Sequence, residues 1–206
     1  MTASPPEPEP PLRTAAERSA RAALLDRPAM QAIEAFRCCV EARFGPTPHA
    51  DPLDGGTDAA VLILLETPGP GEMQPRFVSR DNPTGTARNL RRFSAAAGLP
   101  RRSTLLWNVV PWHIHAPGAR NRAPRRREIA DGLALLPAFL ALLPRLRVVV
   151  LAGRVAGLAA PSLEGRGSHI LTMPHPSPTF VNTAPTIAPR LVATLREAAA
   201  IARGEA

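Results

Sequence analysis

Four short apolar runs, separated by amphipathic stretches, organise the chain. The runs are residues 59–65, 104–110, 147–152 and 169–173. They are nearly continuous in apolar residues, which is typical of strands buried on both faces. Helical patterns separate or follow them at about 84–97, 124–143, 155–160 and 185–203. Strands that alternate with helices predict an α/β fold with three layers (α/β/α) around a central, mainly parallel four-stranded sheet.

The chain before the first run divides into a leader and two expected helices. Residues 1–12 contain five prolines, and this Pro/Glu-rich composition predicts a disordered leader. A single domain is expected over residues 13–206. Thr14 and Glu17 have the spacing of a capping box that begins a helix. Pro28 suits the first turn of a second helix, because its missing N–H has no helical partner at that position.

The positive charge is concentrated in one quarter of the chain. All 25 basic residues are arginine, against 17 acids, and the net charge is +8. Residues 73–127 hold twelve of the arginines and a single acid, Asp81. A GC-rich genome can account for the choice of arginine over lysine, but it does not explain this clustering. The clustering suggests a surface for a polyanion, since guanidinium groups bind phosphate oxygens well.

Several protein classes are excluded at this stage. The two cysteines, Cys38 and Cys39, are neighbours and cannot supply a four-cysteine zinc or iron–sulfur site within one chain. We expect no metal and no cofactor. No apolar run approaches the ~20 residues of a membrane-spanning helix, and the amino terminus has no apolar signal-peptide core. We expect a cytoplasmic monomer without a membrane partner.

Polar residues follow three of the four predicted strands. Residues 66–69 form a Glu-Thr-Pro-Gly turn after the first strand, Asn108 lies near the end of the second, and residues 174–178 follow the fourth. The carboxyl ends of parallel strands lie at one edge of a sheet, where α/β proteins bind their ligands. Each segment by itself is equally typical of an ordinary turn or cap. Their combination is far more specific.

This combination resembles the uracil-DNA glycosylase superfamily over about residues 61–190. Leu65-Glu66-Thr67-Pro68-Gly69 is similar to the Gly-Glu-Ala-Pro-Gly motif of certain bacterial and archaeal families. Those families also contain Asn-Val-Val, here residues 108–110, and a later Asn-Arg segment, here 121–124. His-Pro-Ser-Pro is complete at residues 175–178. The resemblance implies a DNA repair enzyme that flips uracil out of uracil-containing DNA and hydrolyses its glycosidic bond.

The resemblance also implies catalytic roles for three matched residues. His175 would stabilise the departing uracil anion by a hydrogen bond to O2, where the negative charge collects. Glu66 and Thr67 both stand where the superfamily handles the attacking water. Glu66 can act as a general base or stabilise the cationic sugar, whereas Thr67 can only hold the water. We favour Glu66.

Four residues are matched to binding of the base. Asn108 offers an acceptor and a donor to the N3–H and O4 edge of uracil, and cytosine presents the opposite pattern. Phe77 stands where the superfamily places an aromatic ring that stacks on the flipped base. Pro68 and Gly69 belong to the turn that would border it.

A further set of residues is expected to contact DNA outside the base pocket. Ser177 lies in the stiff proline loop that would press on the phosphates. The superfamily often has a leucine here that fills the space left by the flipped base. This chain has Thr179 at that position, and the adjacent Phe180 is better suited to fill the space. Three consecutive arginines, residues 125–127, stand at the start of the helix expected over 124–143. Cations are unfavourable at a helix N-terminus unless an anion offsets them, which favours a DNA phosphate at this position. The arginines expected at DNA are Arg80, Arg88, Arg125, Arg126 and Arg127.

Some departures from the resemblance leave alternatives open. The most similar families hold an iron–sulfur cluster on four cysteines, which this chain lacks. His113 and His115 could bind a metal as a pair, or they could face solvent or phosphate. With Thr67 where several families have Asp or Asn, a catalytically inactive uracil- or DNA-binding module of the same fold is one alternative. The other is an unrelated α/β enzyme whose Pro-Gly turn binds a nucleotide.

Overall fold

The computed structural model describes residues 12–71, 73–116, 118–119 and 121–205. The predicted leader therefore lies outside the described residues except for Leu12, which is fully buried. Helix α1 (Ala15–Ala22) begins with the expected capping box, in which Thr14 accepts from the Glu17 N–H. Helix α2 (Pro28–Phe44) begins at Pro28, also as predicted.

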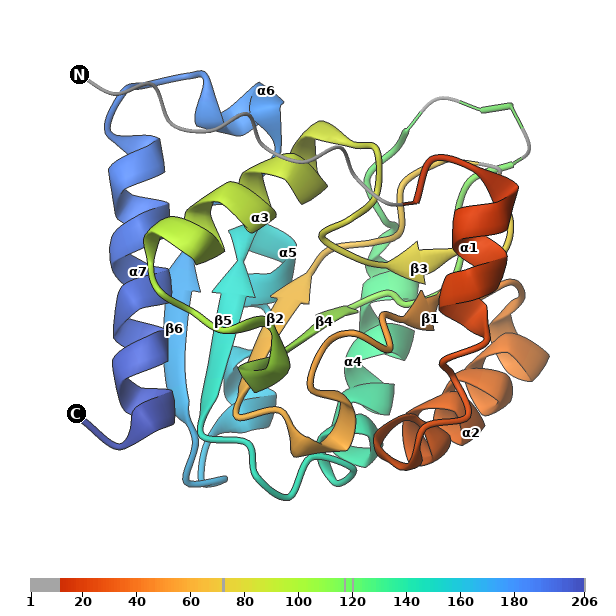
Figure 1. The fold of residues 1–206 in the computed structure, drawn as a ribbon, viewed down its shortest axis with the longest axis horizontal. Helices are drawn as coiled ribbons and strands as arrows, with labels where there is room; N and C mark the ends of the chain where they lie inside the picture. Colours follow the sequence, from red (N-terminus) through yellow and green to blue (C-terminus); the bar gives the residue numbers. More distant parts are fainter. Residues whose placement is uncertain (1–11, 72, 117, 120, 206) are drawn as a thin grey trace.

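A four-stranded parallel sheet forms the centre of the fold, as the apolar runs predicted (Figure 1). Its order is β4–β2–β5–β6, with bounds β2 (Val61–Leu65), β4 (Thr104–Asn108), β5 (Val148–Ala152) and β6 (His169–Met173). Every residue of β2, β4 and β5 is buried, whereas β6 is partly exposed. Strands covered on both faces have no polar face to alternate with, which explains their continuous apolar runs.

Helices cover both faces of this sheet and complete the predicted three-layer fold. Helices α3 (Gly85–Ala96) and α7 (Ile187–Arg203) pack against one face, and α2, α4 (Arg126–Leu140) and α5 (Gly153–Gly157) against the other (Figure 1). Alternate residues of β2 enter the two cores: Leu62 and Leu64 in one, Val61 and Ile63 in the other. None of the described helices is long and apolar enough to cross a bilayer.

Two elements have no counterpart in the hydrophobic pattern. A small second sheet pairs β1 (His49–Ala50) in parallel with β3 (Phe77–Val78). A single-turn helix, α6 (Pro178–Val181), follows the His-Pro-Ser-Pro motif. Elements of two or four residues are too short for a hydrophobic period to be visible in the sequence.

Candidate active site

The first two polar strand ends lie side by side, as predicted. Strands β2 and β4 are neighbours, and Leu65 pairs with Asn108 in register. The two chains continue together beyond the sheet, where the Val110 N–H donates to the Glu66 carbonyl at 3.0 Å. Glu66 therefore begins its turn directly beside the end of β4.

A glycine lets the third strand end lie close against the end of β5. His175 follows β6, and β5 separates β6 from β2. The residue directly after β5 is Gly153, with φ +88°, and a Cβ there would lie 3.0 Å from the Cβ of His175. The missing side chain gives the histidine room at the end of β5. Sequence reasoning overlooked Gly153, although a glycine between a buried strand and a helix often marks such a close approach.

The hydrogen bonding of His175 determines which ring nitrogen carries the proton. The Ser177 backbone N–H donates to Nδ1 of His175 at 3.2 Å. An imidazole nitrogen that accepts a hydrogen bond carries no proton, so the neutral ring holds its proton on Nε2. Burial lowers the pKa of His175 below its ordinary value of 6.5. The side chain is thus a neutral hydrogen-bond donor through Nε2.

Glu66 is a half-buried carboxyl group with one cation nearby. Burial raises its pKa, and the charge of Arg154, at the start of α5, acts in the opposite direction. Thr67 is also half-buried. A carboxylate with a raised pKa can accept a proton at moderate pH and can stabilise a neighbouring positive charge. The hydroxyl of Thr67 has neither property.

Asn108 is the most enclosed polar residue of the predicted site, with 3% of its surface exposed. None of the residues described in the structure hydrogen-bonds to its side-chain amide. The carbonyl oxygen and the NH₂ group are therefore available to a ligand that presents one donor and one acceptor.

Arginine and histidine side chains support the turn after β2. Pro68 is buried in this turn and Gly69 is exposed. The Arg76 guanidinium donates to the Gly69 carbonyl at 2.5 Å, and the His115 ring lies close to the Pro68 carbonyl. Burial, with Arg76 and His115 nearby, lowers the pKa of His113 to about 4. The His115 ring thus packs against the turn, and Nε2 of His113 and both ring nitrogens of His115 are buried rather than facing solvent as one alternative had it.

Phe77 lies in β3, in the small second sheet, and is 4% exposed. Its ring contacts the His49 ring, with centroids 5.6 Å apart and planes inclined by 39°. The Asn82 side-chain amide donates to the Phe77 carbonyl at 2.7 Å. The ring and the backbone of Phe77 are thus each held by a separate contact.

Helix α3 supports the His-Pro-Ser-Pro loop, a function that sequence reasoning did not assign to it. The Asn89 side chain donates to the Pro176 carbonyl at 2.9 Å. At Gly85, an added Cβ would lie 2.2 Å from the Pro178 ring, so only glycine fits there without rearrangement. Beyond this contact, Thr179 and Phe180 are exposed on α6, Phe180 to 45% despite its large apolar ring.

The arginines expected at DNA divide into exposed and buried ones. Arg88 on α3 and the three arginines 125–127 at the start of α4 are exposed. Arg80 is only 5% exposed: its guanidinium donates to the Thr104 hydroxyl and lies 3.8 Å from the Asp54 carboxylate. Inside the fold it cannot reach a phosphate. The expectation that Arg80 contacts DNA is therefore wrong, because Asp54 and Thr104, both distant in the sequence, enclose its guanidinium.

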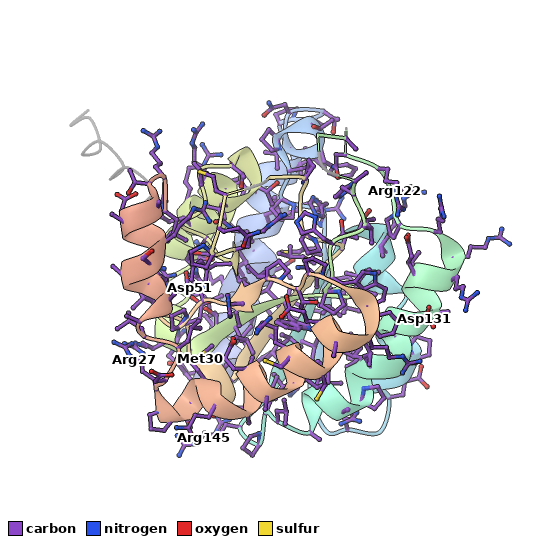
Figure 2. All side chains as sticks on the ribbon, turned by 90° about the vertical axis from the view of Figure 1, so that its right-hand side faces the viewer. Arg27, Met30, Asp51, Arg122, Asp131 and Arg145 are labelled. Atoms are coloured by element: carbon purple, nitrogen blue, oxygen red, sulfur yellow. The ribbon has the colours of Figure 1, made fainter. Side chains whose placement is uncertain are left out.

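The start of α4 already has its own anion. The Glu128 carboxylate accepts from the Arg125 backbone N–H at 2.6 Å and pairs with Arg122 at 2.6 Å. Arg122 lowers the pKa of Glu128 to about 2. Arg122 lies above the first turn of α4, and Asp131 lies further along the helix (Figure 2). Because Glu128 offsets the positive charge at this helix start, the helix dipole no longer argues for a phosphate. The remaining argument for a DNA contact at this helix start is the exposed positive charge of residues 125–127.

The comparisons with known proteins identify the family. The model of the uracil DNA glycosylase superfamily matches residues 53–199, well over half of the chain. The protein therefore belongs to the uracil DNA glycosylase superfamily. A solution structure from Methanosarcina acetivorans, titled as that of a "putative Uracil DNA glycosylase", is 20% identical, with a TM-score of 0.47 over 74% of this chain and 97% of that one. No curated protein matches the chain.

The cysteines do not fit the iron–sulfur cluster of the families that the first motif resembles. Such a cluster needs four thiolates that converge from different segments. Cys38 and Cys39 are adjacent and exposed on α2. The described residues also contain no group of three or more His, Cys, Asp or Glu side chains that could hold a metal ion.

Proposed function

We propose that this protein hydrolyses the N-glycosidic bond of deoxyuridine in DNA and releases free uracil. The observation that carries the proposal is the neutral Nε2–H form of His175, fixed by the Ser177 N–H, at the sheet edge where Asn108 and Glu66 also lie. Family membership supports the reaction class. The role of each residue follows from its chemistry.

In this reaction the C1′–N1 bond breaks and its electron pair leaves with the base. The uracil anion carries much of its charge on O2, and the sugar becomes oxocarbenium-like. The Nε2–H of His175 donates to O2, which stabilises the transition state more than the ground state. A neutral donor suffices, and the low pKa of His175 keeps the ring neutral. Water then adds to C1′ and gives up a proton.

Glu66 serves the other half of the reaction. As a carboxylate it stabilises the cationic sugar and accepts the proton of the attacking water. Asn108 recognises the base, since its carbonyl accepts from N3–H and its amide donates to O4. Phe77 stacks on the flipped base, Pro68 and Gly69 border it, and Phe180 fills the space that the base leaves in the duplex.

The direct test is release of free uracil from a synthetic oligonucleotide with one deoxyuridine. A strand with thymine or cytosine at that position is the matched substrate control. Release of uracil alone supports the proposal. Tight binding of the uracil strand without release would instead indicate an inactive binding module, and equal treatment of all three strands would refute the proposal.

We expect Glu66→Gln to slow uracil release by about a hundredfold, the typical contribution of a general base. In the wild type, activity should fall as the pH decreases through the pKa of Glu66, because the protonated carboxyl group is neither a base nor an anion. Burial places this fall above the ordinary value of 4.5. Glutamine does not titrate, so the acidic fall should disappear in the variant. An unchanged acidic fall in single-turnover rates would assign it to another group.

The exposed arginines at the start of α4 are proposed as contacts to the DNA backbone. Each phosphate contact contributes about 0.9 to the slope of log affinity against log salt. Changing Arg125, Arg126 and Arg127 to Gln should therefore weaken binding at every sequence and reduce the slope by up to about three. Arg145→Gln is the control, because Arg145 is exposed at the opposite end of the molecule (Figure 2). An unchanged slope in the triple variant would show that these arginines form a solvated helix face and do not contact DNA.

A further inference from the structure

The segment that carries Phe77 is held by residues outside the family match. Residues 12–52, called here the N-terminal segment, precede the matched residues 53–199. They contact three successive residues before and within β3. Arg18 donates to the Pro75 carbonyl at 3.1 Å, the His49 N–H donates to the Arg76 carbonyl at 2.9 Å, and His49 pairs with Phe77 in register.

Polar contacts between side chains of the N-terminal segment orient the His49 ring against Phe77. Nδ1 of His49 lies 2.7 Å from a Glu34 carboxylate oxygen on α2. The same oxygen accepts from the Arg37 guanidinium at 2.9 Å. The His49 ring is therefore fixed from behind while its other side contacts the Phe77 ring at 5.6 Å. A tilted aromatic contact of this kind favours one orientation of each ring.

A buried ion cluster holds the residues that follow Phe77. Arg21 on α1 binds Asp51 at 2.5 Å and Asp81 at 3.1 Å, and Arg101 binds the same two carboxylates at 2.6 Å each. Asp51 is fully buried beside α1 (Figure 2). The Ser79 hydroxyl also donates to Asp51. Two guanidinium groups shared by two carboxylates connect the N-terminal segment to the chain just beyond β3.

Strand β3 depends on these contacts because its own pairing is small. It has two residues, and β1 beside it also has two. A two-stranded sheet of this length contributes little stability by itself. We propose that the N-terminal segment clamps β3 and that His49 is the positioning residue that sets the Phe77 ring for stacking on the flipped base. The effect on the base rests on the function proposed above, whereas the clamp itself does not.

The experiment compares His49→Ala with His49→Phe, which keeps an aromatic ring but loses the bond to Glu34. Binding is measured with an oligonucleotide that contains 2′-fluoro-2′-deoxyuridine, which resists hydrolysis. Single-turnover release is measured with the ordinary deoxyuridine strand. We expect His49→Ala to weaken binding and raise KM about five- to tenfold, as expected for loss of an aromatic contact. The rate at saturation should stay within about twofold, and His49→Phe should restore most of the binding.

A second measurement separates this proposal from the proposed function. Hydrogen exchange of the amides of residues 77–81 should be faster in His49→Ala, while that of β2 and β5 stays as in the wild type. Equal exchange at 77–81 in both proteins overturns the clamp. Faster exchange with unchanged uracil binding overturns the effect of the clamp on the base. A wild type that neither releases uracil nor prefers it in binding refutes the proposed function, and the exchange data still decide the clamp.

Discussion

Replacing His175 with alanine should slow uracil release by about a hundred- to a thousandfold, the usual effect of removing one donor to a developing anion. The loss should appear in the single-turnover rate at saturating DNA, since the hydrogen bond to O2 strengthens only as the glycosidic bond breaks. Circular dichroism and thermal unfolding should show an intact fold, because His175 is only partly buried and lies in the loop beyond the end of β6. A near-normal rate would show that His175 does not act on the leaving group.

A change at the backbone of Ser177 tests the cause of this effect. Ser177→Pro removes the N–H that holds Nδ1 of His175, and the φ of −64° at this residue already suits proline. We expect a slower rate than in the matched control Ser177→Ala, which keeps the N–H. Similar rates in the two variants would show that the tautomer of His175 does not depend on this hydrogen bond.

Replacing Asn108 with alanine should lower the efficiency of uracil release by about a hundredfold. Two hydrogen bonds to a buried amide contribute about 3 kcal/mol together, and each 1.4 kcal/mol is a factor of about ten. The preference for uracil over cytosine should decrease at the same time. Cytosine leaves the buried amide of Asn108 unpaired in the wild type, and the alanine variant has no such amide. The measurement is kcat/KM on matched uracil and cytosine strands.

Asn108→Asp provides the complementary test of base recognition. A carboxylate accepts hydrogen bonds but does not donate, so it loses the bond to O4 of uracil and gains an acceptor for the exocyclic amine of cytosine. The ratio of cytosine to uracil release should therefore rise above that of Asn108→Ala. An unchanged ratio in both variants would place base recognition elsewhere.

Most of the central fold could be predicted because its pattern is local. Strands β2, β4 and β5 are buried on both faces, and such strands are visible as continuous apolar runs. Thr14, Glu17 and Pro28 marked helix starts by chemistry that acts within one turn. Glu66 lies beside the end of the strand that carries Asn108 because the two strands are parallel, and the carboxyl ends of parallel strands share one edge of the sheet.

The errors and omissions concern contacts between residues distant in the sequence. Arg80 carries the same charge as Arg88, but Asp54 and Thr104 enclose it, and no feature near residue 80 indicates this. The small sheet pairs residues 49–50 with 77–78, and two-residue strands have no hydrophobic period.

The sequence by itself determined the α/β class, the strand ends that carry polar residues and the motifs of the superfamily. Strand burial and turn chemistry depend on residues that are adjacent in the sequence, so both are visible there. Only the tertiary structure decided how these residues are held. It placed Gly153 against His175, the Ser177 N–H on Nδ1, and the N-terminal segment against Phe77. Such contacts depend on the close approach of separate segments, and packing at that distance is settled only when the whole chain is folded.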